Sequence, residues 1–148
     1  MKALDLSQRP PRPCRAELGG ITYLPRAIDK VRGALPGGNP GEYFSLYDEV
    51  PTLSALFYRR MGITHDEFAA VVASAESEAD VLAWLRSRAD DAAVEKFTRQ
   101  LLGLRFGGIP DEGKSTVRSL YPGAAHASDD TLLVDLIDAD DAAMFARS

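Results

Sequence analysis

Four side chains in the first third of the chain have the types and spacing of an anion-binding site. Arg26 and Lys30 are four residues apart, so in a helix they are neighbours on one face. Glu42 and Tyr43 follow a loop rich in glycine and proline that could fold back on them. Two cations beside a phenol can donate several charge-assisted hydrogen bonds. The pattern predicts a ligand- or anion-binding site made of Arg26, Lys30, Glu42 and Tyr43.

The backbone before these side chains favours the same chemistry. Pro25 suits the first position of a helix, so we expect a helix from Pro25 to about Leu35. The free N–H groups and the dipole of such a helix start attract an anion. Gly19 and Gly20, just before it, permit backbone angles that other residues rarely adopt. A small anion or a protein partner is the expected ligand.

Two other interpretations of these residues stay open. The charged groups Arg26, Asp29, Lys30 and Glu42 could pair with one another and simply fix the first helix. Alternatively, Glu42 or Asp29 could be the general base of a small enzyme, with Arg26 or Lys30 as the electrophile. The enzyme would need one of these carboxylates free in a pocket with a perturbed pKa. A non-enzymatic binding or adaptor domain is the leading hypothesis, and no catalytic residue is assigned.

A second candidate site is the run Gly108–Ser115, which matches the phosphate-binding loop pattern letter for letter. In such a loop, backbone N–H groups between Gly108 and Gly113 wrap the phosphates. Lys114 would reach the β- and γ-phosphate oxygens, and Ser115 would bind magnesium. Nucleotide binding at these four residues is therefore the third hypothesis.

The surroundings of this run argue against a nucleotide site. The pattern requires a buried strand before the loop and a substantial helix after it. Residues 98–105 instead continue a helical pattern, and Pro122 follows Lys114 after only a short interval. We therefore expect a Gly/Pro loop that leads into a short helix, with Lys114 in solvent.

The other reactive side chains predict neither a metal centre nor a cofactor. His65 and His126 are far apart in the sequence, and Cys14 is the single cysteine, so zinc-ligand spacing is absent. Cys14 lies between basic residues but has no histidine near it in the sequence. A C-terminal acidic cluster is interpreted as a solvated face, with oxygen ligation of a divalent cation as the alternative; it comprises Asp135, Asp138, Asp140 and Asp141.

Composition sets broad limits on the partners and on the compartment. The 148 residues carry a net charge of −5, which argues against sequence-independent binding of nucleic acid. The first 35 residues nevertheless carry a net charge of +4, so they could pack against the acidic remainder or contribute to an anion site. One cysteine, no signal-peptide core and no apolar run of membrane-spanning length predict a cytoplasmic location without a membrane association.

The spacing of apolar residues predicts an all-α fold: a compact bundle of five to seven helices in a single domain. Residues 1–17 form an extended arm rich in proline and arginine, and residues 18–148 form the helical body. A Thr64/Glu67 capping box starts one helix, and Gly62 ends the helix before it. The helices are expected at 25–35, 48–61, from 64 onward, at 78–88, 90–102 and 115–120, and from 128 onward. The last of these could instead be a buried strand at 132–137, which periodicity does not separate from a helix.

The chain resembles an uncharacterised family of small bacterial proteins, the domain of unknown function numbered 5069. The resemblance lies in the Pro/Arg arm, in Leu18-Gly19-Gly20, Leu24-Pro25-Arg26, Ile28-Asp29-Lys30 and Gly41-Glu42-Tyr43, and more loosely in the residues after them. Phe44-Ser45-Leu46-Tyr47 departs from the family pattern. The resemblance implies a soluble bacterial one-domain protein, and it brings neither a known activity nor catalytic residues.

Overall fold

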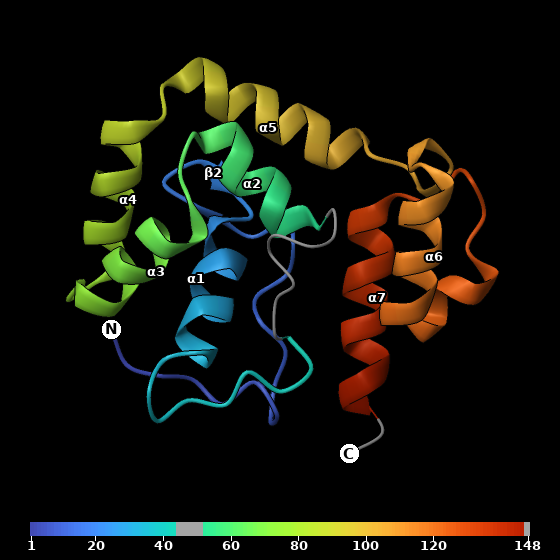
Figure 1. Ribbon diagram of the computed structural model, residues 1–148, viewed down its shortest axis with the longest axis horizontal. Helices are drawn as coiled ribbons and strands as arrows, with labels where there is room; N and C mark the ends of the chain where they lie inside the picture. Colours follow the sequence, from blue (N-terminus) through green and yellow to red (C-terminus); the bar gives the residue numbers. More distant parts are fainter. Residues whose placement is uncertain (44–51, 147–148) are drawn as a thin grey trace. The chain divides into compact units, whose positions relative to one another are not determined.

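The computed structural model describes residues 1–43 and 52–146, and most of this part is helical. It contains seven α-helices, two short 3₁₀ helices and one two-stranded sheet within those residues (Figure 1). The predicted all-α class is confirmed, with the small sheet as an addition. The chain divides into two compact units, Met1–Thr98 and Arg99–Ser148. The single-domain organisation stays a prediction, and each unit is described by itself.

The first unit holds the sheet and most of the helices. Helix α1 packs against α3, α3 packs against α4, and α1 also contacts the sheet. Figure 1 shows α1 in blue, next to the green helices α3 and α2. The elements are β1 (Glu17–Leu18), β2 (Ile21–Thr22), α1 (Leu24–Gly33), α2 (Leu53–Met61), α3 (His65–Ser74), α4 (Glu78–Arg88) and α5 (Asp91–Gly103), of which α5 continues into the second unit.

The sheet is a tight hairpin in which Gly19 and Gly20 form the two-residue turn. Both glycines have positive φ, 58° and 80°, as the hairpin turn that matches strand twist requires. The unusual backbone angles that we expected of these two glycines are confirmed, but they serve a hairpin turn rather than the start of α1 itself. Strands of two residues are too short to show an alternating pattern, which is why the hairpin was not predicted.

An aromatic cluster forms the core of the first unit around Phe57 of α2, which is fully buried. Its ring centroid lies 5.4 Å from that of Phe97, 5.8 Å from that of Phe68 and 5.9 Å from that of Tyr23. Rings at these separations, mostly tilted or edge to face, attract one another beyond the area that they bury. The cluster thereby joins α2, α3 and α5 to the start of α1.

Local signals in the sequence locate most helix ends correctly. Gly62 ends α2 with a φ of 68°, as predicted, and Asp90 caps α5 through a 2.8 Å bond from Ala93 N. Helix α2 begins after Thr52, whose Oγ1 accepts from Ala55 N at 3.1 Å. The start that we predicted near residue 48 lies outside the described residues.

The predicted capping box of α3 is confirmed. Glu67 N donates to Thr64 Oγ1 at 3.1 Å, and Thr64 N donates to Glu67 Oε2 at 2.9 Å. Arg88 at the end of α4 adds an ion pair to Glu67 at 3.2 Å. Two hydrogen bonds hold the pKa of Glu67 below its ordinary 4.5. The larger effect comes from the backbone N–H of Thr64 and the next from the side chain of Arg88.

The capping box predicts a pH dependence of stability that Glu67→Gln should abolish. A carboxyl with a lowered folded-state pKa stabilises the fold above its unfolded pKa, and this contribution disappears as the pH falls through the folded value. The wild type should therefore melt higher than Glu67→Gln above pH 4.5, and the difference should vanish as the pH falls through the lowered pKa of Glu67. Thermal melts of both proteins across this range measure it. A difference that stays constant down to the lowest pH would contradict the assignment.

The N-terminal arm runs beside α1 and the loop that follows it. Leu6 N donates to Asn39 O at 2.7 Å, and Asn39 N donates to Leu4 O at 2.9 Å. The side chain of Leu6 is 1% exposed, and Cys14 farther along the arm is completely buried. The arm is therefore part of the folded unit rather than a detached segment.

The second unit is built around Phe106 and the apolar face of α7. Phe106 is fully buried, and the guanidinium carbon of Arg118 lies 5.0 Å from its ring centroid. The 3₁₀ helix η2 lies against both α6 and α7. The elements that follow α5 are η1 (Phe106–Gly108), α6 (Asp111–Leu120), η2 (Pro122–His126) and α7 (Leu133–Ala146).

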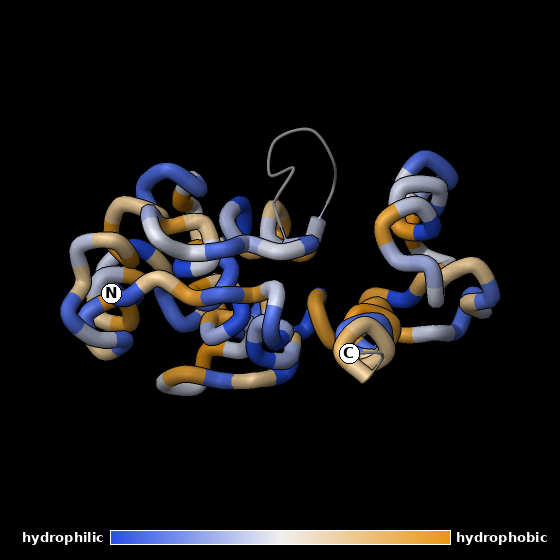
Figure 2. Tube along the Cα trace, turned by 90° about the horizontal axis from the view of Figure 1, so that it is seen from below, coloured by the Kyte–Doolittle hydropathy of each residue, from blue (hydrophilic) through white to orange (hydrophobic). Residues whose placement is uncertain are grey.

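Helix α7 settles the alternative that periodicity left open at residues 132–137. These residues form a helix from Leu133 onward, and only Leu132 makes an isolated antiparallel bridge, to Arg105. Figure 2 shows apolar stretches of α7 in orange beside the C-terminus. Across residues 1–43 and 52–146, none of the helices combines the length and the apolar character that a bilayer crossing needs.

Candidate functional site

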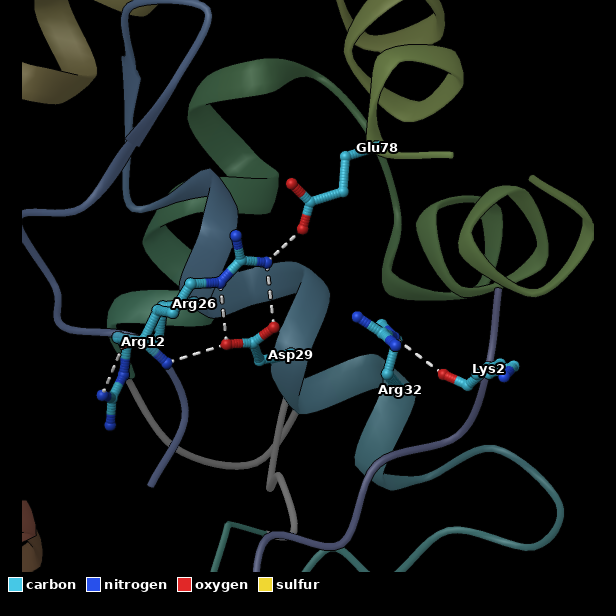
Figure 3. Close-up of polar contacts among 6 residues, drawn as sticks. All are labelled: Lys2, Arg12, Arg26, Asp29, Arg32 and Glu78. Atoms are coloured by element: carbon cyan, nitrogen blue, oxygen red, sulfur yellow. Dashed lines mark hydrogen bonds and ion pairs between the residues drawn. The ribbon is translucent and has the colours of Figure 1, made fainter. Parts of the chain in front are cut away.

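Asp29 on α1 is the buried centre of a partly buried ion-pair cluster (Figure 3). Its side chain is 7% exposed and accepts three hydrogen bonds from Arg12: from N at 2.8 Å, from Nε at 3.0 Å and from Nη2 at 2.9 Å. The same Nη2 of Arg12 also donates to Glu78 Oε1, at the start of α4. We call Arg12, Asp29 and Glu78 the arginine clasp, because it joins the arm to α1 and α4.

The arginine clasp keeps its cation charged. Partial burial of the guanidinium lowers the pKa of Arg12, but the hydrogen bonds and negative charges of Asp29 and Glu78 raise it by more. The pKa of Arg12 therefore lies above its ordinary value. Both oxygens of Asp29 are directed at Arg12, an arrangement that does not favour Asp29 as a general base.

Arg26 and Tyr43 meet in the same unit. Arg26 is 3% exposed, its Nη1 donates to Arg12 O at 3.3 Å, and its guanidinium carbon lies 5.6 Å from the centroid of the Tyr43 ring. Tyr43 is 8% exposed, whereas its neighbour Glu42 is exposed to solvent. The loop after α1 thus folds back on Arg26 through Tyr43.

Lys30 contacts a buried hydroxyl pair, Tyr23 and Ser54, that was not predicted from the sequence. Lys30 Nζ donates to Ser54 Oγ at 3.0 Å, and the Tyr23 hydroxyl lies 2.9 Å from the same oxygen. Ser54 is 1% exposed and Tyr23 is 2% exposed. The three groups form one continuous chain of hydrogen bonds between α1 and α2.

Two features of the sequence could have pointed to this pair. Ser54 interrupts an otherwise apolar run in α2, and a buried serine needs a hydrogen-bond partner. Tyr23 stands at the N-cap of α1, where serine, threonine, aspartate or asparagine is usual. It has a φ of 76°, a left-handed conformation that is strained for an aromatic residue.

The start of α1 is buried rather than open to a ligand. Leu24, its first residue, has no exposed surface, and Pro25 in the first turn is buried as well. This placement does not favour an anion on the N–H groups of the helix start. The predicted site residues Arg26 and Lys30 lie farther along α1 and contact Tyr43 and Ser54 instead.

Comparison with known families identifies the chain. A family model described as Domain of unknown function (DUF5069) matches residues 8–143. The chain belongs to this family. The match to DUF5069 includes the arginine clasp, Arg26, Lys30 and the Tyr23–Ser54 pair. No curated protein matches the chain.

The nucleotide-loop pattern of this DUF5069 member lies mostly inside a helix. Helix α6 begins at Asp111, so Gly113, Lys114 and Ser115 all have helical backbone. Lys114 Nζ lies 3.9 Å from Asp129 Oδ1 and 5.9 Å from the ring centroid of Phe106. Helical backbone does not wrap a phosphate as the loop pattern requires, and residues before it, up to Gly103, belong to α5. This arrangement does not favour nucleotide binding at Gly108–Ser115.

A metal site is not indicated by the part of the DUF5069 chain that the structure describes. Within residues 1–43 and 52–146, His, Cys, Asp and Glu side chains do not gather in a group of three that could hold a metal ion.

Proposed function

We propose that this DUF5069 protein is a binding domain that holds a small oxyanion, a phosphate or a carboxylate, between Arg26 and Lys30. The observation that carries the proposal is the inward placement of both cations on α1. Arg26 is almost completely buried against Tyr43, and Lys30 reaches the buried hydroxyl of Ser54. Both side chains are thereby held by their neighbours rather than spread into solvent.

The burial of Arg26 and the partial burial of Lys30 strengthen their attraction for an anion. Two charges interact more strongly where the surroundings are less polarisable than water, and hydrogen bonds between charged groups are about twice as strong as neutral ones. Arg26 and Lys30 also stand one helical turn apart, so one oxyanion can reach both. Their existing contacts would position them before the ligand arrives, which lowers the entropic cost of binding.

The neighbouring hydroxyls suit the same ligand. Ser54 carries an O–H group that contacts Lys30, and Tyr43, whose ring lies against Arg26, carries another; either could donate to an oxyanion. The exposed carboxylate of Glu42 is adjacent to Tyr43 and would oppose an anion nearby. Glu42→Gln is therefore the one variant of the predicted site that should leave oxyanion binding intact or strengthen it.

An enzymatic role for the same residues has less support. A general base must reach a substrate proton, yet both oxygens of Asp29 accept hydrogen bonds from Arg12. Glu42 is exposed to solvent, so it does not lie in the enclosed pocket that an enzymatic base would need. Binding without chemistry is the function that these positions support best.

Titration calorimetry with inorganic phosphate and with acetate, at constant ionic strength, tests the proposal. One of the two anions should bind the wild type, and Lys30→Met should weaken that binding by about tenfold or more, the value of a hydrogen bond to a charged group. Arg32→Met is the matched control, because Arg32 lies on the same helix and donates to Lys2 O instead (Figure 3).

Two outcomes would refute the proposal. The first is that neither anion binds a correctly folded wild type at millimolar concentration. The second is that Arg32→Met weakens binding as much as Lys30→Met, which would mean general surface attraction rather than a site. Circular dichroism on each variant establishes that the helical fold is retained.

A further inference from the structure

The second unit contains a groove of its own, between η2 and α7. It is open on one side and has a volume of about 490 Å³, within the range of small-molecule sites in proteins. Pro122 and Gly123 of η2 line one side, and Leu136, Ala139 and Ala143 of α7 line the other. We call this the η2–α7 groove. It lies entirely within residues 122–144 and is separate from the oxyanion site proposed on α1.

Small side chains keep the η2–α7 groove open. Ala139 and Ala143 are one helical turn apart on α7, and both are exposed. Opposite them, Gly123 contributes no side chain. Leu136, which is 7% exposed, and Met144 complete the apolar lining. The lining is therefore a surface on which an apolar body of modest size can lie.

Of the four polar side chains that line the groove, His126 and Thr131 are not acidic, whereas two on α7 carry negative charge. Asp135 and Asp140 both line it, and Asp140 Oδ1 points towards η2, 3.8 Å from where a Cβ of Gly123 would stand. Asp138 and Asp141 lie on the same helix and add to the negative potential. A carboxylate can accept about four hydrogen bonds, so Asp135 and Asp140 can serve a ligand in addition to their contacts within the protein.

We propose that the η2–α7 groove binds a small organic amine whose ammonium group lies at Asp140 and Asp135 and whose apolar body lies on Leu136, Ala139 and Ala143. An apolar lining with two carboxylates complements such an amphiphile in both shape and charge. An anionic ligand would be repelled by the same carboxylates. A bare metal ion would use none of the apolar surface, and the described residues offer it no group of three ligands.

Methyl NMR on the full chain tests the proposal directly. The chain has three methionines, of which Met144 lines the groove and Met61, in the first unit, is 1% exposed. The probes are 4-phenylbutylamine, 4-phenylbutanol and 4-phenylbutanoate, which share one apolar body and differ in charge. The amine should shift the Met144 methyl resonance saturably and leave Met61 unchanged. The alcohol should bind about tenfold more weakly, as loss of a charged hydrogen bond implies.

Three variants distinguish a built site from general attraction. Asp140→Asn should weaken amine binding by about tenfold and remove the preference for amine over alcohol. Ala139→Leu should abolish binding of both, because it fills the groove at an exposed position where leucine is a good helix former. Asp138→Asn is the control, since it makes the same charge change on α7 outside the groove.

The proposal is overturned if the amine and the alcohol bind equally, or if Met144 does not respond to the amine. It is also overturned if Asp138→Asn weakens amine binding as much as Asp140→Asn does. Each of these results can be obtained while phosphate and acetate binding at Arg26 and Lys30 is present or absent, so the two sites are tested independently.

Discussion

Gly41→Ala is expected to destabilise the unit Met1–Thr98 by about 3 kcal/mol. Gly41 has a φ of 56°, a left-handed conformation that costs other residues about 1–2 kcal/mol. A Cβ at this position would also lie 2.7 Å from Leu6 O, which belongs to the backbone of the arm and has little freedom to move. Alanine must therefore push the arm away from the loop after α1.

Gly37→Ala separates these two contributions. Gly37 has a similar φ of 85°, but a Cβ there meets no atom within 4 Å. This variant should lose only the conformational part, about 1 kcal/mol. Urea unfolding can be followed by the fluorescence of Trp84, the single tryptophan. Trp84 lies in the same unit as Gly37 and Gly41 and therefore reports on both variants. Equal losses in the two variants would show that the close approach to Leu6 contributes nothing.

Arg12→Ala is expected to cost about 2–3 kcal/mol, because it leaves the buried carboxylate of Asp29 without its guanidinium. Breaking a fully buried pair typically costs about 3–5 kcal/mol, and the lower figure allows for the 38% exposure of the Arg12 side chain. Arg9→Ala, an exposed arginine in the same arm, should change stability by less than about 0.5 kcal/mol. Urea unfolding of both variants compares them.

A second substitution shows whether the unpaired charge is the cause. Arg12→Ala combined with Asp29→Asn removes the charge and keeps an acceptor for the backbone N–H of residue 12. The double variant should regain about 1 kcal/mol over Arg12→Ala alone, since a neutral amide is less costly to bury than a carboxylate. If the double variant is instead less stable than the single one, the arginine clasp does not act through the buried charge of Asp29.

Helix ends were predictable because they depend on a few neighbouring residues. The Thr64/Glu67 capping box and the Gly62 cap each lie within four residues of the backbone groups that they satisfy. Helix α4 spans Glu78–Arg88, the predicted range, because its apolar spacing is undisturbed by glycine or proline. Such local agreement needs no knowledge of the tertiary fold.

The partners in the candidate site were not predictable in the same way. The helical spacing of Arg26 and Lys30 was evident, but Arg12 reaches Asp29 across 17 residues and Lys30 reaches Ser54 across 24. Tyr23 and Ser54 are 31 residues apart and meet only because α1 packs near α2. Pairings of this kind follow from tertiary packing, and no periodic pattern in the sequence encodes them.

Helix α6 shows how packing overrides local preference. Gly113 and the proline before Asp111 indicated a loop up to residue 114, yet the helix begins at Asp111. Gly113 is buried in its first turn, where a Cβ would lie 2.4 Å from Ile109 Cγ2. The glycine is thus needed for close packing on Ile109, although it weakens the helix taken alone.

The complete burial of Cys14 allows opening of the arm to be followed by the rate at which a reagent modifies this thiol. A thiol reacts only when the reagent reaches its sulfur, and Cys14 has no exposed surface in the folded protein. Because it is the single cysteine, each molecule can react once and at one place. The rate of modification in native buffer therefore measures how often the chain around Cys14 opens, and an Arg12→Ala variant that reacts faster would show that this opening involves the arm. Cys14 is thus a natural probe of opening, two residues from Arg12, which joins the arm to α1 and α4.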